Sequence, residues 1–149
     1  MYIPQIRCYH PTANQQSHVF YLLSKGNNAG QPSFNPWQNS FQVVCNKSDW
    51  FDFYFWLCYG LFKAGKFKQH QRGSVIPFIN KGDVLEILKQ TAPAIYPDWK
   101  RYQQIVEALS KLEKKKASLT EQIIATEKLQ SLLIRSYFTQ HTPGHNKAI

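Results

Sequence analysis

Residues 98–138 contain neither glycine nor proline, and this absence constrains the fold more than any other feature of the sequence. Pro97 stands just before the stretch, in a place where the first turn of a helix tolerates proline. We therefore expect one long helix, which at about 1.5 Å per residue would span ~60 Å. The rest of a 149-residue chain is too small to cover such a helix along its whole side.

Apolar side chains recur along this stretch at the heptad spacing of a coiled coil. Val106 adds to the series in its first turns, and polar residues interrupt it at Lys116, Thr126 and Gln130. We expect the apolar side to pair with the same helix of a second copy, in an antiparallel homodimer, or with a helix of another protein. The residues assigned to this helix-pairing interface are Tyr102, Ile105, Leu109, Leu112, Leu119, Ile123, Leu133 and Tyr137.

A helical hairpin is the alternative to one continuous helix. The segment SLTE, residues 118–121, has the form of a capping box that could begin a second helix after the basic residues 114–116. A tight reversal usually requires glycine or proline, however, and neither occurs there. The sequence therefore favours the continuous helix.

The whole chain predicts an α+β fold in which a small mixed α/β domain precedes the long helix. We place the α/β domain in residues 1–95, the helical segment in residues 96–138 and a flexible tail in residues 139–149. His141 and His145 have the spacing of two metal ligands, but they lie in the polar tail, which we expect to fray. We therefore assign the chain no metal site.

Local patterns within the first domain predict two strands and two helices. Residues 18–26 and 40–46 are rich in β-forming residues and are bounded by turn residues. Residues 48–63 begin with a serine and a carboxylate that suit a helix start, and they predict an aromatic core helix. We expect residues 67–79 to be extended and residues 80–90 to form a short helix. Its side chains that should face the core are Val84, Leu85, Ile87 and Leu88.

Charge and cysteine content narrow the classes of function. Eighteen Lys and Arg against nine Asp and Glu leave a formal net charge of +9, so a polyanion is the first partner to consider. Three cysteines without a C-x-x-C pair argue against a disulfide framework and a closed zinc site, and they fit a reducing cytoplasm. The N-terminus lacks the pattern of a signal peptide. The most apolar stretch, residues 50–62, is too short to cross a bilayer.

The segment GLFKAGKF, residues 60–67, has the spacing of a phosphate-binding loop but not its chemistry. Such a loop needs a serine or threonine after the lysine to hold Mg²⁺, and that position is Phe67. The segment also follows a predicted helix, whose end offers carbonyls rather than amides to an anion. We therefore interpret Gly60 and Gly65 as the fraying and the end of the aromatic helix.

Catalytic groups are scarce in this sequence. A small hydrolase with a cysteine–histidine pair would have to combine Cys45 or Cys58 with His18 or His70. Both cysteines lie in apolar segments, where a buried structural role is expected. The four aspartates, Asp49, Asp52, Asp83 and Asp98, stand near predicted helix starts, where capping accounts for them. We expect no enzymatic activity and no cofactor.

Basic and amide residues gather in two segments that contain no acid. Lys and Arg neutralise phosphates, whereas Asn, Gln and Arg can pair with base edges, so these segments have the chemistry to bind duplex DNA. Ordinary turn residues on a solvated charged face are the alternative. The candidate DNA-binding residues are Lys25, Asn27, Asn28, Gln31, Gln38, Asn39, Lys63, Lys66, Lys68, Gln69, His70, Gln71 and Arg72.

Three successive motifs follow a known arrangement: GSVIPFINKGDVLEI from residue 73, prolines at positions 93 and 97, and QQIVEALSKLEKKKASLTEQI from residue 103. The arrangement resembles the distal part of a target-recognition domain and the following spacer helix in the specificity subunits of type I restriction-modification systems. The resemblance covers residues 37–138. The chain is also similar to small bacterial proteins of unknown function from mobile elements. The positions that match the family's motifs are Gly73, Ser74, Asp83, Val84, Leu85, Ile87, Pro93, Pro97, Gln104, Ile105, Val106, Leu109 and Leu112.

This resemblance implies a half specificity subunit, which recognises a DNA target and catalyses nothing itself. A full subunit has two recognition domains and two such helices, whereas this chain has one of each. Our leading hypothesis is therefore a cytoplasmic DNA-binding protein that pairs through its long helix. The alternative is a module for helix-mediated protein–protein interaction, in which the positive charge has no specific partner.

Overall fold

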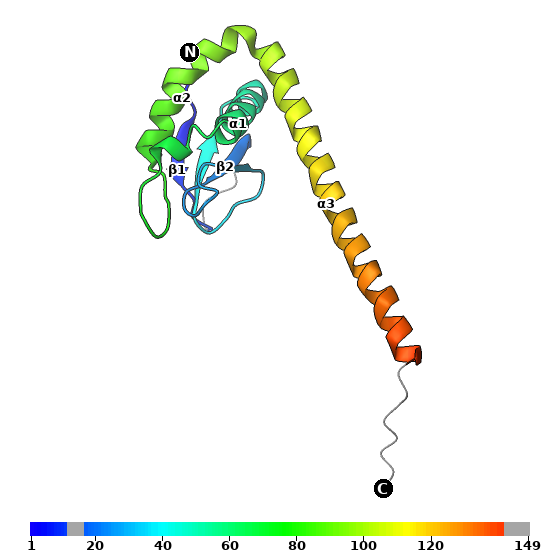
Figure 1. Cartoon of the computed structure of the whole chain (residues 1–149). Coiled ribbons are helices and arrows are strands. Elements are labelled where there is room, and N and C mark those ends of the chain that lie inside the picture. Colours follow the sequence, from blue (N-terminus) through cyan, green and yellow to red (C-terminus); the bar gives the residue numbers. More distant parts are fainter. Residues whose placement is uncertain (12–16, 142–149) are drawn as a thin grey trace. The chain divides into compact units, whose positions relative to one another are not determined.

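The computed structural model of the chain describes residues 1–11 and 17–141 (Figure 1). Its fold is α+β, as the sequence predicts, with a small antiparallel sheet, helices, and a long C-terminal helix. The four strands have the order β1-β4-β2-β3 in the sheet. Their bounds are Gln5–Cys8 for β1, Val19–Leu23 for β2, Pro32–Ser33 for β3 and Ser40–Val44 for β4.

The helices follow the sheet in the sequence. The α-helices are α1 (Ser48–Lys63), α2 (Lys81–Ile95) and α3 (Trp99–His141), and the short 3-10 helices are η1 (Lys68–His70) and η2 (Tyr96–Asp98). The chain divides into two compact units, Met1–Val106 and Glu107–Ile149. Within the described ranges, no helix has the length and apolarity needed to cross a membrane. The predicted tail begins inside α3, and its residues 142–149 lie outside the described residues.

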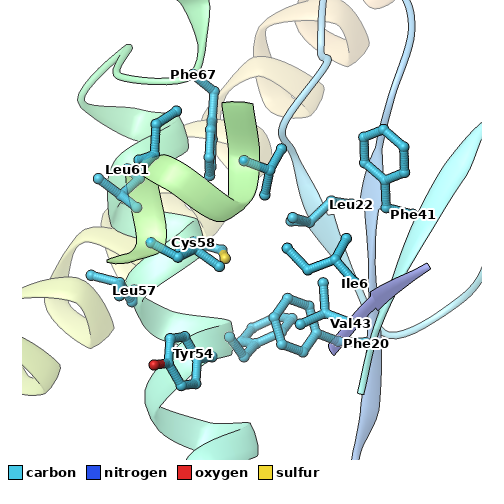
Figure 2. Close-up of a cluster of buried hydrophobic side chains, with 14 of the residues drawn as sticks. Ile6, Phe20, Leu22, Phe41, Val43, Tyr54, Leu57, Cys58, Leu61 and Phe67 are labelled. Carbon is cyan, nitrogen blue, oxygen red and sulfur yellow. The ribbon is translucent and has the colours of Figure 1, made fainter. Parts of the chain in front are cut away.

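The core of the first unit lies between one face of the sheet and helix α1 (Figure 2). Side chains alternate between the two faces of a strand, so every second residue points into the core. Val43 of β4 pairs with Ile6 of β1 on one side and with Phe20 of β2 on the other. Tyr54 and Cys58, one turn apart on α1, meet this row and are fully buried. Helix α2 contacts β1.

Strands β2 and β4 and helix α1 form where the sequence predicts them. Gly65, just beyond α1, has a φ of +70° and lets the chain leave the helix, as expected. Gly60, in contrast, lies inside the helix and not at a frayed end. A Cβ at Gly60 would lie 1.9 Å from the hydroxyl of Tyr102, so the glycine makes room for the first turns of α3.

The structure corrects the sequence-based expectations at three other places. Strand β1 was not predicted. Residues 67–79 are not extended, since they contain η1 and then pair with other backbone through isolated bridges at Phe78. Helix α2 does not stop near residue 90 but continues through Pro93 to Ile95. Proline removes one backbone hydrogen bond at this position, close to where the helix ends in any case.

Helix α3 is continuous over its 43 residues, so residues 118–121 do not form the turn of a hairpin. Its first turns belong to the first unit, where Val106 is buried. The hydroxyl of Tyr102 donates toward the backbone carbonyls of Trp56 at 3.4 Å and Leu57 at 3.3 Å. The expectation for Tyr102 is therefore corrected: its side chain packs against α1 instead of joining the exposed side of α3.

Candidate nucleic-acid interface

Two segments that are distant in the sequence lie against each other in the first unit. They are residues 24–31, which follow β2, and residues 66–72, which follow α1, and we call them the paired loops. Phe67 of the second loop is fully buried and lies under Gly30 of the first. A Cβ at Gly30 would lie 2.6 Å from the Cβ of Phe67, so only glycine permits this approach.

Backbone hydrogen bonds close the first loop on itself. The amide of Gly30 donates to the carbonyl of Leu23 at 2.6 Å, and the amide of Ala29 donates to the carbonyl of Gly26 at 3.0 Å. Gly26 and Gly30 have φ values of +91° and +95°, a region that favours glycine. The side-chain amide of Gln71 donates to the carbonyl of Ala29 at 3.0 Å and so joins the second loop to this turn.

The second loop begins where α1 ends. The amide of Lys66 donates to the carbonyl of Leu61 at 2.9 Å, and the single turn of η1 follows. Phe67 is buried, whereas the side chains on both sides of it in the sequence are exposed. The second loop therefore combines one buried apolar side chain, Phe67, with exposed polar ones. The exposed polar residues around Phe67 are Lys66, Lys68, Gln69 and His70.

The turn before β4 lies beside the first loop. The amide of Ser24 donates to the carbonyl of Asn39 at 2.9 Å, and both Gln38 and Asn39 are exposed. At the tip of the first loop, Asn27 and Asn28 are also exposed. The two turns that carry these exposed amides are thus joined through the backbone at the start of the first loop.

Charge in the paired loops is one-sided. Neither loop contains an acid, and the exposed lysines are Lys25, Lys66 and Lys68. In the described part of the chain these three lysines have no ion pair. A polyanion at this surface would therefore meet three lysines whose charge is not compensated by an ion pair within the described ranges.

Three of the predicted DNA-binding residues have contacts inside the fold instead. Nη2 of Arg72 lies 3.3 Å from Oδ1 of Asp83, which partly neutralises the guanidinium. The ammonium of Lys63 lies 5.5 Å from the centre of the Tyr59 ring on its own helix. The side-chain amide of Gln71 is used in joining the two loops. We assign these three side chains mainly to the support of the surface.

A family model matches residues 6–136, which is most of the chain. The chain belongs to DUF6943, a family of unknown function. No curated protein and no solved structure matches it. The matched part of this DUF6943 chain includes both paired loops and nearly all of α3.

Sequence reasoning missed an apolar tip next to the paired loops of the DUF6943 chain. Arg72 and Phe78 exchange two backbone hydrogen bonds, of 2.9 and 2.8 Å, and so close a loop between them. Within that loop Val75 exposes 90% of its surface and Ile76 exposes 63%. The run VIPFI indicated a strand, but Gly73, with a φ of +92°, turns the chain into the loop instead. This glycine is the signal that could have identified the loop.

Two of the three cysteines of the DUF6943 chain lie in the core. Cys45 and Cys58 are buried, as predicted. Burial raises the pKa of the Cys45 thiol to about 12 and holds the pKa of the Cys58 thiol well above its ordinary value. Because the thiolate is the nucleophile, burial disfavours a nucleophilic role for both side chains at neutral pH. Among the described residues, no group of three or more His, Cys, Asp or Glu is placed to hold a metal ion.

One of the three thiols should react readily with an aromatic disulfide reagent at neutral pH, because Cys8 is exposed and the other two are buried. We expect one equivalent of chromophore per chain in native buffer and three in denaturant, measured by absorbance. The Cys8→Ser chain is the control and should show no rapid release. Rapid reaction of a second thiol in the native chain would contradict the burial of Cys45 and Cys58.

Proposed function

We propose that this DUF6943 chain is a non-catalytic DNA-binding protein and that its paired loops contact duplex DNA. One observation carries the proposal. Two acid-free segments, distant in the sequence, are joined by Phe67 and Gln71, and both carry exposed lysines or amides. A solvated charged face would not require such a specific junction between the two loops.

The exposed side chains divide into two chemical groups. Lys25, Lys66 and Lys68 supply compact positive charges that neutralise phosphates and release counterions. The side chains of Asn27 and Asn28, at the tip of the first loop, carry the paired donor and acceptor that read an adenine edge in the major groove. The proposal thus separates residues that set affinity from residues that set sequence preference.

The resemblance to target-recognition domains supports the same function. It covers residues 37–138, which include the second loop and the loop that follows it. In that family the specificity subunit recognises DNA, and other subunits carry out the chemistry. We therefore propose that any nuclease or methyltransferase activity would belong to a partner.

A salt series of fluorescence anisotropy titrations on labelled duplex DNA tests the proposal. Log affinity should fall linearly with log salt, and each lost phosphate contact should reduce the slope by about 0.9. The triple variant of Lys25, Lys66 and Lys68 to alanine should therefore lose up to about 2.7 of the slope. The matched control replaces Lys111, Lys114 and Lys115 of α3, which removes the same charge elsewhere and should change the slope little.

Two results would contradict the proposal. One is no binding above background at ~50 mM salt by a chain whose fold is confirmed by circular dichroism. The other is an equal loss in the control variant, which would place the DNA site on α3. The Asn27→Ala/Asn28→Ala chain adds a separate readout, since it should weaken discrimination among duplex sequences while leaving the salt slope unchanged.

A further inference from the structure

Helix α3 carries a long row of apolar side chains, most of which are exposed to solvent. A heptad series stays on one side of a helix, and here it runs from Ile105 to Tyr137 with polar members at Lys116, Thr126 and Gln130. We call this series the α3 stripe. Apolar surface of this extent marks a site of interaction with another molecule. Its large members expose between 45% and 67% of their surface, and they are Ile105, Leu112, Leu119, Ile123, Leu133 and Tyr137.

We propose that the α3 stripe binds the same stripe of a second copy, with the two helices antiparallel and the two-fold axis at residue 121. Each stripe position then faces the partner's position that lies equally far from residue 121 in the opposite direction. Every position has a counterpart in this register because the series is symmetric about its centre. The facing apolar pairs are Ile105 with the partner's Tyr137, Leu109 with the partner's Leu133, and Leu119 with the partner's Ile123.

The polar positions of the stripe favour the antiparallel orientation. In this register Lys116 faces the partner's Thr126 and lies one residue from the partner's Glu127, which can compensate its charge. In a parallel pair in register, Lys116 would face its own copy within the interface, and two like charges would be brought together out of water. The remaining polar member, Gln130, faces the partner's Leu112.

Thr126 is a polar member of the stripe, but its hydroxyl is already hydrogen-bonded within α3. Its hydroxyl donates to the carbonyl of Gln122 on the same helix at 2.8 Å, so the polar atom already has a partner. The methyl group is what remains to pack against the facing helix. A shallow hollow at the centre of the proposed register has Thr126 on its wall, together with Leu119 and Ile123. Such a hollow is the kind of hole that a side chain of a facing helix fills.

Self-pairing accounts for the stripe better than a helix from another protein. Opposite Lys116 the second copy supplies Thr126, which is short, and next to it Glu127, which is negatively charged. The chain's own sequence therefore provides a suitable partner for this lysine. Six of the seven apolar members of the stripe also face an apolar residue of the partner in this register, and Leu112, which faces Gln130, is the exception. The contact would extend over about 48 Å of helix, at about 1.5 Å per residue, which suits a stable dimer.

Sedimentation of the full chain tests whether the stripe forms the interface. The wild type should sediment as a dimer at tens of micromolar, and the Leu119→Asp/Ile123→Asp chain should dissociate at least roughly a hundredfold more readily. The matched control, Lys114→Asp/Lys128→Asp, changes charge on the opposite side of α3 and should remain dimeric. A monomeric wild type, or a control as weakened as the stripe variant, would overturn the proposal.

Thiol cross-linking tests the orientation, in a Cys8→Ser background that removes the exposed native thiol. Gln122 lies beside the two-fold axis in the antiparallel register, so Gln122→Cys should give a linked dimer with a short bis-maleimide. Leu133→Cys should not, because the two copies of residue 133 would be about 36 Å apart along the helices. Efficient linkage through residue 133 would replace this register with a parallel one. No linkage at either position, in a chain that sediments as a dimer, would place the interface elsewhere.

Discussion

Replacing Phe67 by alanine should lower the free energy of unfolding by about 3–5 kcal/mol, the usual cost of truncating a buried aromatic side chain. Phe67 has no exposed surface and fills the junction between the paired loops. Urea titrations followed by tryptophan fluorescence measure the change. DNA affinity should also fall in this variant, even under conditions where the chain remains folded, because the loops lose their common anchor.

Phe34→Ala is the matched control for this prediction. Phe34 exposes 62% of its surface and its ring stacks on Phe55, with 4.2 Å between ring centres. Its truncation should cost only about 1 kcal/mol, the typical contribution of one aromatic pair. Equal losses in the Phe34 and Phe67 variants would show that Phe67 is not the anchor of the junction.

Replacing Gly30 by alanine should lower the free energy of unfolding by about 2–5 kcal/mol, through two independent effects. The new Cβ would overlap the Cβ of Phe67, which lies next to the backbone and cannot swing away. The backbone at residue 30 also has a φ of +95°, which strains any residue with a side chain. The same urea titrations measure this change.

Two further variants separate these effects. Gly82→Ala, in the first turns of α2 with open space around it, should be neutral or stabilising by about 0.5–1 kcal/mol. The Gly30→Ala/Phe67→Ala chain should not be rescued, because alanine at position 67 retains the overlapping Cβ. A recovery of stability in the double variant would mean that the Phe67 ring alone causes the conflict.

The elements that the sequence predicts correctly are those whose signals are local. Helix α1 has Asp49 in its first turn and a glycine just past its end, although Ser48 lies inside the helix and does not cap it. Helix α3 has an uninterrupted run of residues that allow a helix. Strands β2 and β4 are continuous β-rich runs bounded by turns. In each case the information lies within the element itself, so no knowledge of its neighbours is needed.

The features that escaped prediction depend on contacts between distant residues. Strand β1 has only four residues and forms by pairing with β4. Tyr102 has the spacing of a helix-pairing residue, but its side chain packs against α1. It fits there because Gly60 has no side chain. The candidate DNA-binding residues were proposed from composition, but the contact between the two loops that carry many of them was not predicted. The available signal for this contact was Phe67, an aromatic residue among basic ones. An aromatic side chain in such a segment is expected to be buried, and it must then pack against another part of the chain.

The loop between Arg72 and Phe78 has a consequence for any molecule that covers Val75 and Ile76. Two backbone hydrogen bonds close its base, and the amide of Gly26 holds the carbonyl of Pro77 at 2.7 Å. A partner therefore meets these two apolar side chains on a segment that is already ordered. The release of water from Val75 and Ile76 then adds to affinity without the loss of conformational entropy that fixing a disordered loop would require.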